Sequence, residues 1–151
     1  MKQYALENMN YYVQGNAPEL LIVSGIHGDE YEVIDCVKKA VNHYQDKLGD
    51  FMFLPEVSPS AIASRTRLNE HGQDVNRCFV DEGKCAEAQM LMPFFSGKKF
   101  KQCISFHEDL EHPCFYMYDS GDMSDDECLA RLRRDVTSLG IELLNGVDDD
   151  N

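Results

Sequence analysis

The sequence predicts an α/β domain in which helices flank a mixed, mostly parallel β-sheet in three layers. Residues 19–24, ELLIVS, form a short, continuous apolar run rich in branched side chains, which is typical of a strand buried on both faces. Residues 30–47 show helical spacing, and a second apolar run, FMFLPEV, occupies residues 51–57. A strand, a helix and a strand in this order indicate the crossover unit of an α/β sheet.

The helix of this unit is expected over residues 30–47, with Gly49 placed to end it. Five side chains recur at helical spacing and predict its buried face: Val33, Val37, Ala40, Val41 and Tyr44. Before the first buried strand, residues 10–13 predict a short strand or hairpin.

The second half of the chain begins with a polar stretch, residues 58–77, which contains Pro59 and Gly72. We interpret it as a long irregular segment, and such loops inside a compact domain are often functional. The elements expected after it are a helix over 85–95 that ends at the proline, strands over 102–109 and 113–119, a helix over 123–139 with Ser124 as N-cap, and a last strand from Ile141.

Length and charge exclude several classes of protein. The chain has 151 residues, which predicts a single domain over 1–151. Its net charge of −13 repels phosphate backbones, so we expect no nucleic-acid partner. No apolar run approaches the roughly 18 residues of a membrane span, and the N-terminus lacks the apolar centre of a signal peptide. We therefore expect a cytoplasmic protein without a membrane partner, whose oligomeric state the sequence does not indicate.

The six cysteines are scattered and form no C-x-x-C pair. In a cytoplasmic chain they are expected to be free thiols, most of them small core residues. Their spacing predicts no zinc–thiolate site.

Two of the predicted strands end in residues that bind metals. SGIHGDE carries His27 and Glu30 after the first buried strand, and QCISFHED carries His107. Ligands of open α/β sheets sit beyond the carboxyl ends of the strands. If the two strands run the same way, these side chains converge as a three-ligand zinc set with a fourth position for water. The alternative is that each is an ordinary hydrogen-bonded polar residue.

The polar segment between these strands carries a second group of functional residues. RLNEHGQDVNR places Arg67 upstream of Asp74, Asn76 and Arg77. An arginine guanidinium holds a carboxylate in a bidentate geometry, so the segment is a candidate anion site within an acidic chain. A solvated basic loop is the alternative, and for the nearby Arg65 a plain surface charge is the favoured interpretation.

The order of these motifs, H-x-x-E, then R…D-x-N-R, then a strand-terminal H, resembles the zinc carboxypeptidases. It is more similar still to their short relatives, the succinylglutamate desuccinylase and aspartoacylase group and its uncharacterised bacterial members. The resemblance spans residues 20–119 and includes HGDE, SPSAI, DVNRCF and SFHEDLEHPCFYMYD. It implies a zinc carboxypeptidase-like fold.

The resemblance implies a role for each matching residue. His27, Glu30 and His107 match the ligands of one Zn²⁺ per chain. Arg67 matches the arginine that polarises the scissile carbonyl. Asn76 and Arg77 match the pair that grips the substrate carboxylate, and Asp74 matches the residue that orients the first zinc histidine. The implied activity is hydrolysis of an amide next to a free carboxylate, in a peptide or a small acyl-amino acid.

One element of the family pattern has no match in this sequence. The family's general base is a glutamate on a later strand, and Glu142, the late carboxylate of this chain, does not match its position. The general base is therefore unknown, and we expect a C-terminally truncated domain. The alternatives are a divergent enzyme with another base and a non-catalytic fragment that binds zinc and a carboxylate.

Overall fold

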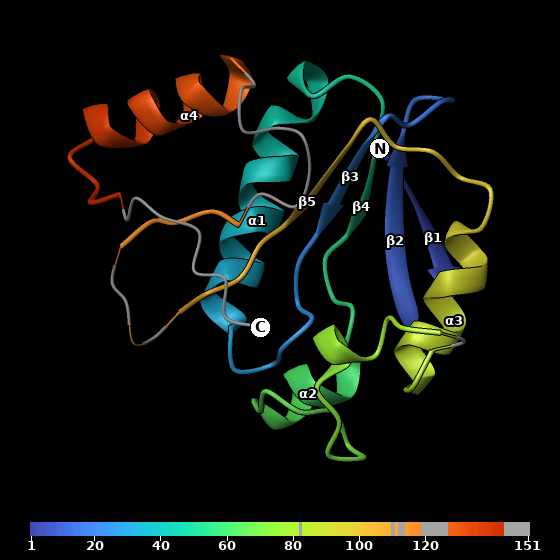
Figure 1. Cartoon of the computed structure of the whole chain (residues 1–151). Helices are drawn as coiled ribbons and strands as arrows, with labels where there is room; N and C mark the ends of the chain where they lie inside the picture. The colour runs from blue at the N-terminus through green and yellow to red at the C-terminus, as the bar shows by residue number, and fades with distance from the viewer. Residues whose placement is uncertain (82, 110, 112–113, 119–126, 144–151) are drawn as a thin grey trace. The chain divides into compact units, whose positions relative to one another are not determined.

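The computed structural model describes residues 1–81, 83–109, 111, 114–118 and 127–143. Contacts within the chain group it into two units, Met1–Glu108 and Asp109–Asn151. The first unit contains the β-sheet (Figure 1), and the predicted site residues all fall within its bounds. The single domain expected over 1–151 stays a prediction.

The sheet has five strands in the order β1-β2-β4-β3-β5. Their bounds are β1 Lys2–Leu6, β2 Met9–Gln14, β3 Leu20–Val23, β4 Phe51–Leu54 and β5 Gln102–Ser105. The central strand β3 pairs in parallel with both β4 and β5, whereas the β1–β2 hairpin joins β4 antiparallel. The sheet is therefore mixed, and its parallel part holds both predicted ligand-bearing strands.

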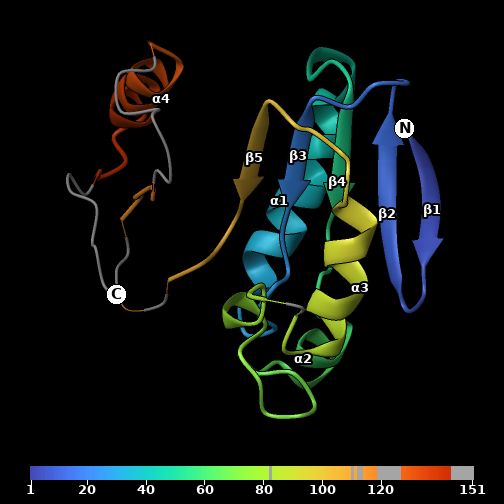
Figure 2. The same cartoon turned by 45° about the vertical axis from the view of Figure 1, so that its right-hand side comes forward.

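Alternate side chains of β3 and β4 enter two separate hydrophobic clusters. Ile22 and Phe53 belong to the cluster that includes residues of helix α1. Leu21 and Met52 belong to the cluster that includes residues of helix α3. Figure 2 shows α1 and α3 on opposite sides of the sheet. The predicted three-layer α/β fold is confirmed.

Helix α1 covers Tyr31–Tyr44 and is followed by a short 3₁₀ turn, η1, over Gln45–Lys47. The expected buried face was partly wrong, because Ala40 and Tyr44 are exposed and Ile34 is buried. Val37 and Val41 are buried as predicted. The true buried stripe thus begins one residue later and ends one turn earlier than the pattern indicated.

The polar segment 58–77 is not wholly irregular. It contains helix α2, Pro59–Ser64, and the 3₁₀ turn η2, Val75–Arg77. Proline suits the first helical position, where its missing N–H has no intrahelical partner. Helix α3, Ala86–Phe95, continues past Pro93, where the helix was expected to end.

The second unit contains helix α4, Glu127–Ser138, inside the helix predicted over 123–139. Residues 123–126, including the predicted N-cap Ser124, lie outside the described residues. The strands predicted over 113–119 and from Ile141 are reduced, among the described residues, to one bridge between Phe115 and Leu143.

The cysteine side chains that the structure describes are free thiols, as expected, but most are not core residues. Cys78 and Cys85 are buried, Cys36 and Cys103 are exposed, and Cys114 is partly buried. Among the described helices, none has the length and apolar composition needed to cross a bilayer.

Candidate metal centre

His27 lies in the loop that follows β3, and two glycines shape that loop. Gly25 has a φ of +67°, and a Cβ there would lie 2.8 Å from the carbonyl oxygen of Pro55. At Gly28 a Cβ would lie 1.9 Å from the carbonyl oxygen of Ala61 in α2. Only glycine permits this close approach, so the backbone packs directly on α2 and turns the His27 side chain inward.

Glu30 is the residue immediately before helix α1 and occupies its N-cap position. Its carboxylate does not cap the helix; it accepts hydrogen bonds from His27 Nδ1 at 2.6 Å and from His107 Nδ1 at 3.0 Å. A negative charge at a helix N-terminus is favoured by about 0.3–1 kcal/mol. The start of α1 therefore both positions and stabilises this carboxylate.

His107 reaches the same place from the neighbouring parallel strand. Val23 of β3 is opposite Ser105 of β5, so the two strands end side by side at the same edge of the sheet. Figure 2 shows the arrowheads of β3 and β5 pointing to this end. One nitrogen or oxygen atom from each of His27, Glu30 and His107 lies within 4.8 Å of the others. The structure thus brings together the three residues predicted as zinc ligands.

Burial and hydrogen bonding set the charges of this cluster. Burial alone raises the pKa of Glu30, but the hydrogen bonds from His107 and His27 outweigh it and lower the pKa to about 2. Burial likewise lowers the pKa of His27, while the hydrogen bonds to Glu30 and Asp74 outweigh it and raise the pKa. Glu30 is therefore an anion in the fold, the form in which a carboxyl group binds a metal.

Asp74 connects the histidine cluster with the arginine segment. Its Oδ1 accepts a hydrogen bond from His27 Nε2 at 3.0 Å and one from the backbone N of Asn76 at 3.0 Å. Its Oδ2 accepts from Arg67 Nε at 3.1 Å and lies 3.0 Å from Arg67 Nη2. A single carboxylate thus holds the ring of His27, caps η2 and anchors the guanidinium of Arg67.

The remaining predicted residues lie on the exposed side of the same segment. Asn76 and Arg77 are exposed residues of η2, directly after Asp74. The side chain of Arg67 is 48% exposed. Arg65 is also exposed, and its guanidinium lies 4.7 Å from the ring centre of Tyr31, so that it packs on an aromatic face. Three cationic side chains therefore line this part of a strongly acidic chain.

The donor set suits zinc. Two imidazoles and one carboxylate are a known three-ligand zinc set, and tetrahedral geometry places such ligand atoms roughly 3.4 Å apart. The nitrogens of His27 and His107 already lie 2.6 and 3.0 Å from the Glu30 oxygens, and one ligand atom from each residue lies within 4.8 Å of the others. Small side-chain shifts would therefore reach that spacing. In addition, the second nitrogen of His27 is held by Asp74, as metal-bound imidazoles usually require. The chain therefore offers both the ligands and the residue that would orient one of them.

The sequence did not indicate the partner of the second histidine. His107 Nε2 lies 3.1 Å from Ser105 Oγ, and both residues are exposed. The two residues are separated by one position, and side chains two apart on a strand share a face. That spacing is the signal that would have identified Ser105.

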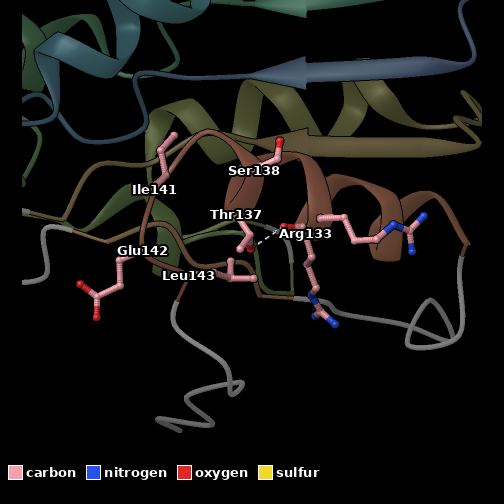
Figure 3. A pocket seen from close by; sticks show the side chains of 7 residues that line it. Arg133, Thr137, Ser138, Ile141, Glu142 and Leu143 are labelled. Atoms are coloured by element: carbon pink, nitrogen blue, oxygen red, sulfur yellow. Dashed lines mark hydrogen bonds between the residues drawn. The ribbon is translucent and has the colours of Figure 1, made fainter.

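Glu142, the late carboxylate of the sequence, belongs to the second unit. Its backbone oxygen accepts a hydrogen bond from Phe115 N at 2.8 Å. Figure 3 shows it beside a surface pocket at the end of α4, with its carboxylate pointing away from Arg133. The general base stays unassigned.

Several solved structures share this fold. A provisionally named metallopeptidase from Shewanella denitrificans has a TM-score of 0.69 and 21% identity, with 99% of this chain covering 62% of that one. An aspartoacylase family protein from Mesorhizobium loti has a TM-score of 0.59 and 19% identity, over 85% of this chain and 43% of that one. A succinylglutamate desuccinylase/aspartoacylase from Rhodobacter sphaeroides reaches 30% identity and a TM-score of 0.53, over 66% of this chain and 32% of that one.

This chain is shorter than the proteins it matches, spanning 62%, 56% and 60% of three Shewanella metallopeptidase structures. No curated protein matches it. A family model, the succinylglutamate desuccinylase/aspartoacylase catalytic domain, matches residues 16–119, a span that contains every predicted site residue. The chain therefore belongs to the succinylglutamate desuccinylase/aspartoacylase catalytic domain family.

Proposed function

We propose that the chain carries the zinc centre of a hydrolase that cleaves an amide bond next to a free carboxylate, as a carboxypeptidase or an N-acyl-amino-acid deacylase. The observation that carries the proposal is the convergence of His27, Glu30 and His107 within 4.8 Å. When bound, zinc would supply a Lewis acid that polarises a carbonyl and lowers the pKa of water to about 7.

The residues around the centre divide the remaining work. Asp74 orients the ring of His27 through its 3.0 Å hydrogen bond. Arg67, which is held on Asp74 and half-exposed, would polarise the carbonyl of the scissile amide. Asn76 and Arg77 would grip the substrate carboxylate, because a guanidinium binds it with two parallel hydrogen bonds. The substrate would enter from the side of His107, whose side chain is 34% exposed, rather than from His27, at 2%.

A second candidate is a non-catalytic module that binds zinc and a carboxylate. One observation favours it: among the described residues, Glu30 and Asp74 are the carboxylates that hydrogen-bond the two histidines, and both are already engaged. Neither is free to take a proton from water, as hydrolysis requires. The two candidates share their metal site and differ in turnover.

The first experiment measures metal content. Protein purified without chelators should hold about one zinc per chain, and His27→Ala or His107→Ala should abolish uptake. A wild-type protein that holds no zinc and takes none up would contradict the proposed centre.

The second experiment measures turnover on panels of acyl-amino acids and peptides. Arg67→Ala should lower kcat about 100-fold or more, whereas Arg77→Ala should mainly raise KM, because the carboxylate is gripped equally before and during reaction. Glu142→Gln tests the late carboxylate as base, with Glu127→Gln in α4 as its control. Carboxylate binding without turnover would favour the module.

A further inference from the structure

A buried carboxylate in the first turn of α3 takes no part in the chemistry proposed above. Glu87 is 8% exposed. Its Oε1 accepts a hydrogen bond from Ser58 Oγ at 2.9 Å, and its Oε2 accepts one from Asn69 Nδ2 at 3.1 Å. Ser58 and Asn69 are buried as well. Burying a carboxylate is costly unless it is hydrogen-bonded, so these three residues form one connected polar network inside the fold.

One end of this network closes the turn before Asp74. Asn69 Oδ1 accepts hydrogen bonds from the backbone N of His71 at 3.1 Å and of Gln73 at 3.0 Å. The backbone N of Asn69 also donates to the oxygen of Gln73 at 3.0 Å. The Asn69 side chain is therefore fully used: its oxygen shapes residues 69–73, and its nitrogen ties them to Glu87.

The other end reaches the loop that carries His27. The backbone N of Ser58 donates to the oxygen of Gly25 at 2.9 Å, and the neighbouring Val57 N donates to Ser24 O at 3.3 Å. Glu87 thus connects, through Ser58, with the chain that leads to His27, and, through Asn69, with the chain between Arg67 and Asp74. Both segments have to stay in register for Asp74 to meet the His27 ring.

We propose that Asn69 and Glu87 are positioning residues of the metal centre: their buried hydrogen bond sets the place of Asp74 and Arg67 against His27. Neither side chain touches the proposed ligands, so they act through Asp74. A buried polar network of this kind favours one backbone arrangement over its alternatives. The consequence for zinc rests on the proposed function, whereas the placement of Asp74 does not.

The donor and acceptor pattern permits a rescue experiment. Asn69→Asp keeps the oxygen that binds the His71 and Gln73 amides but sets a second carboxylate against Glu87. Adding Glu87→Gln restores the pair with its polarity reversed, since the new amide donates to the new carboxylate and its oxygen still accepts from Ser58. A purely structural role would make zinc affinity of the folded protein insensitive to these changes.

Zinc affinity is measured by competition with a chromophoric chelator, well below the unfolding temperature. We expect Asn69→Asp to weaken zinc binding about tenfold or more, and Asn69→Asp with Glu87→Gln to return to within about threefold of wild type. Val41→Ala, in the separate cluster under α1, is the control for lost stability and should leave zinc affinity unchanged. Wild-type affinity in folded Asn69→Asp, or no recovery in the double variant, would overturn the proposal.

A metal-independent measurement separates this inference from the proposed function. The backbone N of Asn76 donates to Asp74 Oδ1, so its hydrogen exchange in chelator reports where the Asp74 side chain lies. Exchange should accelerate in Asn69→Asp and recover in the double variant, even if wild type binds no zinc. If Asn69→Asp does not fold, Ser58→Ala, which removes one hydroxyl, should give the same acceleration more weakly. Unchanged exchange in the folded variants would refute the positioning role.

Discussion

The two histidines of the candidate centre are held in very different ways. The ring of His27 is 2% exposed and contacts carboxylates through both nitrogens, Glu30 on one side and Asp74 on the other. The side chain of His107 is 34% exposed, and its second nitrogen is within hydrogen-bond distance of the Ser105 hydroxyl. His107 follows β5, which pairs only with β3 among the described strands. His27 is therefore a buried residue of the candidate centre, and His107 is a partly exposed one.

The buried and the exposed histidine suit two different tasks of a metal site, which are to hold a ligand in place and to admit a substrate. A buried ligand with two charged partners keeps its orientation whether or not a metal is bound. An exposed ligand leaves room for a substrate beside it. The asymmetry also predicts that equivalent substitutions on the two sides have unequal effects.

The largest expected difference concerns the stability of the metal-free fold. His27→Ala removes the donor of Glu30 Oε1 and one of the two donors of Asp74 Oδ1, and breaking a buried pair of this kind costs about 3 kcal/mol or more of unfolding free energy. His107→Ala also removes a donor from Glu30, but it should cost less than about 1 kcal/mol, because the side chain is 34% exposed and water can enter the space to replace that hydrogen bond. Urea denaturation in the presence of chelator measures both, and equal losses would contradict the asymmetry.

The next difference concerns zinc affinity when the hydrogen-bond partner of each histidine ring is removed. Asp74→Ala should weaken zinc binding about 10- to 100-fold, the usual effect of removing the residue that orients a metal-bound histidine. Ser105→Ala should change it less than about threefold, since water can replace an exposed hydroxyl. Asn76→Ala, which keeps the backbone N–H on Asp74, is the control for effects on η2. A larger loss in Ser105→Ala than in Asp74→Ala would reverse the assignment of roles.

The smallest difference lies in backbone dynamics. Amides of β5 should exchange faster with solvent than those of β3, because β3 is flanked by two strands and β5 has one strand partner among the described residues. Hydrogen exchange followed by mass spectrometry resolves the two peptides. If zinc is bound through His107, exchange in β5 should slow more on metal addition than exchange in β3.

The buried parts of the fold were predictable because burial leaves a strong pattern in the sequence. The two apolar runs that form β3 and β4 are too short and too apolar for anything but buried strands. The rule that ligands bind beyond the carboxyl ends of parallel strands pointed to His27, Glu30 and His107. Helix α2 was missed because its proline and serines are typical of loops, although Pro59 is also well suited to a first helical turn. The shifted face of α1 reflects packing against the sheet, which periodicity alone does not encode.

The connections behind the site were beyond such prediction. Glu87 meets Asn69 across 18 positions and Ser58 across 29, and neither separation carries a local signal. Those contacts form only in the folded chain, where the first turn of α3 meets the residue before α2 and the loop after α2. The same holds for Asp74, whose role was implied by resemblance but whose simultaneous contact with His27 and Arg67 required the folded chain.

The shared carboxylate of Asp74 has a consequence for how the centre would respond to its ligands. An anion that draws the Arg67 guanidinium toward itself loosens the Arg67–Asp74 contact and leaves more of the negative charge of Asp74 to the His27 ring, which makes that imidazole a stronger electron donor. Binding at the arginine and binding at the histidines are then thermodynamically linked. Because such linkage is reciprocal, zinc and a carboxylate ligand would change each other's dissociation constants by the same factor.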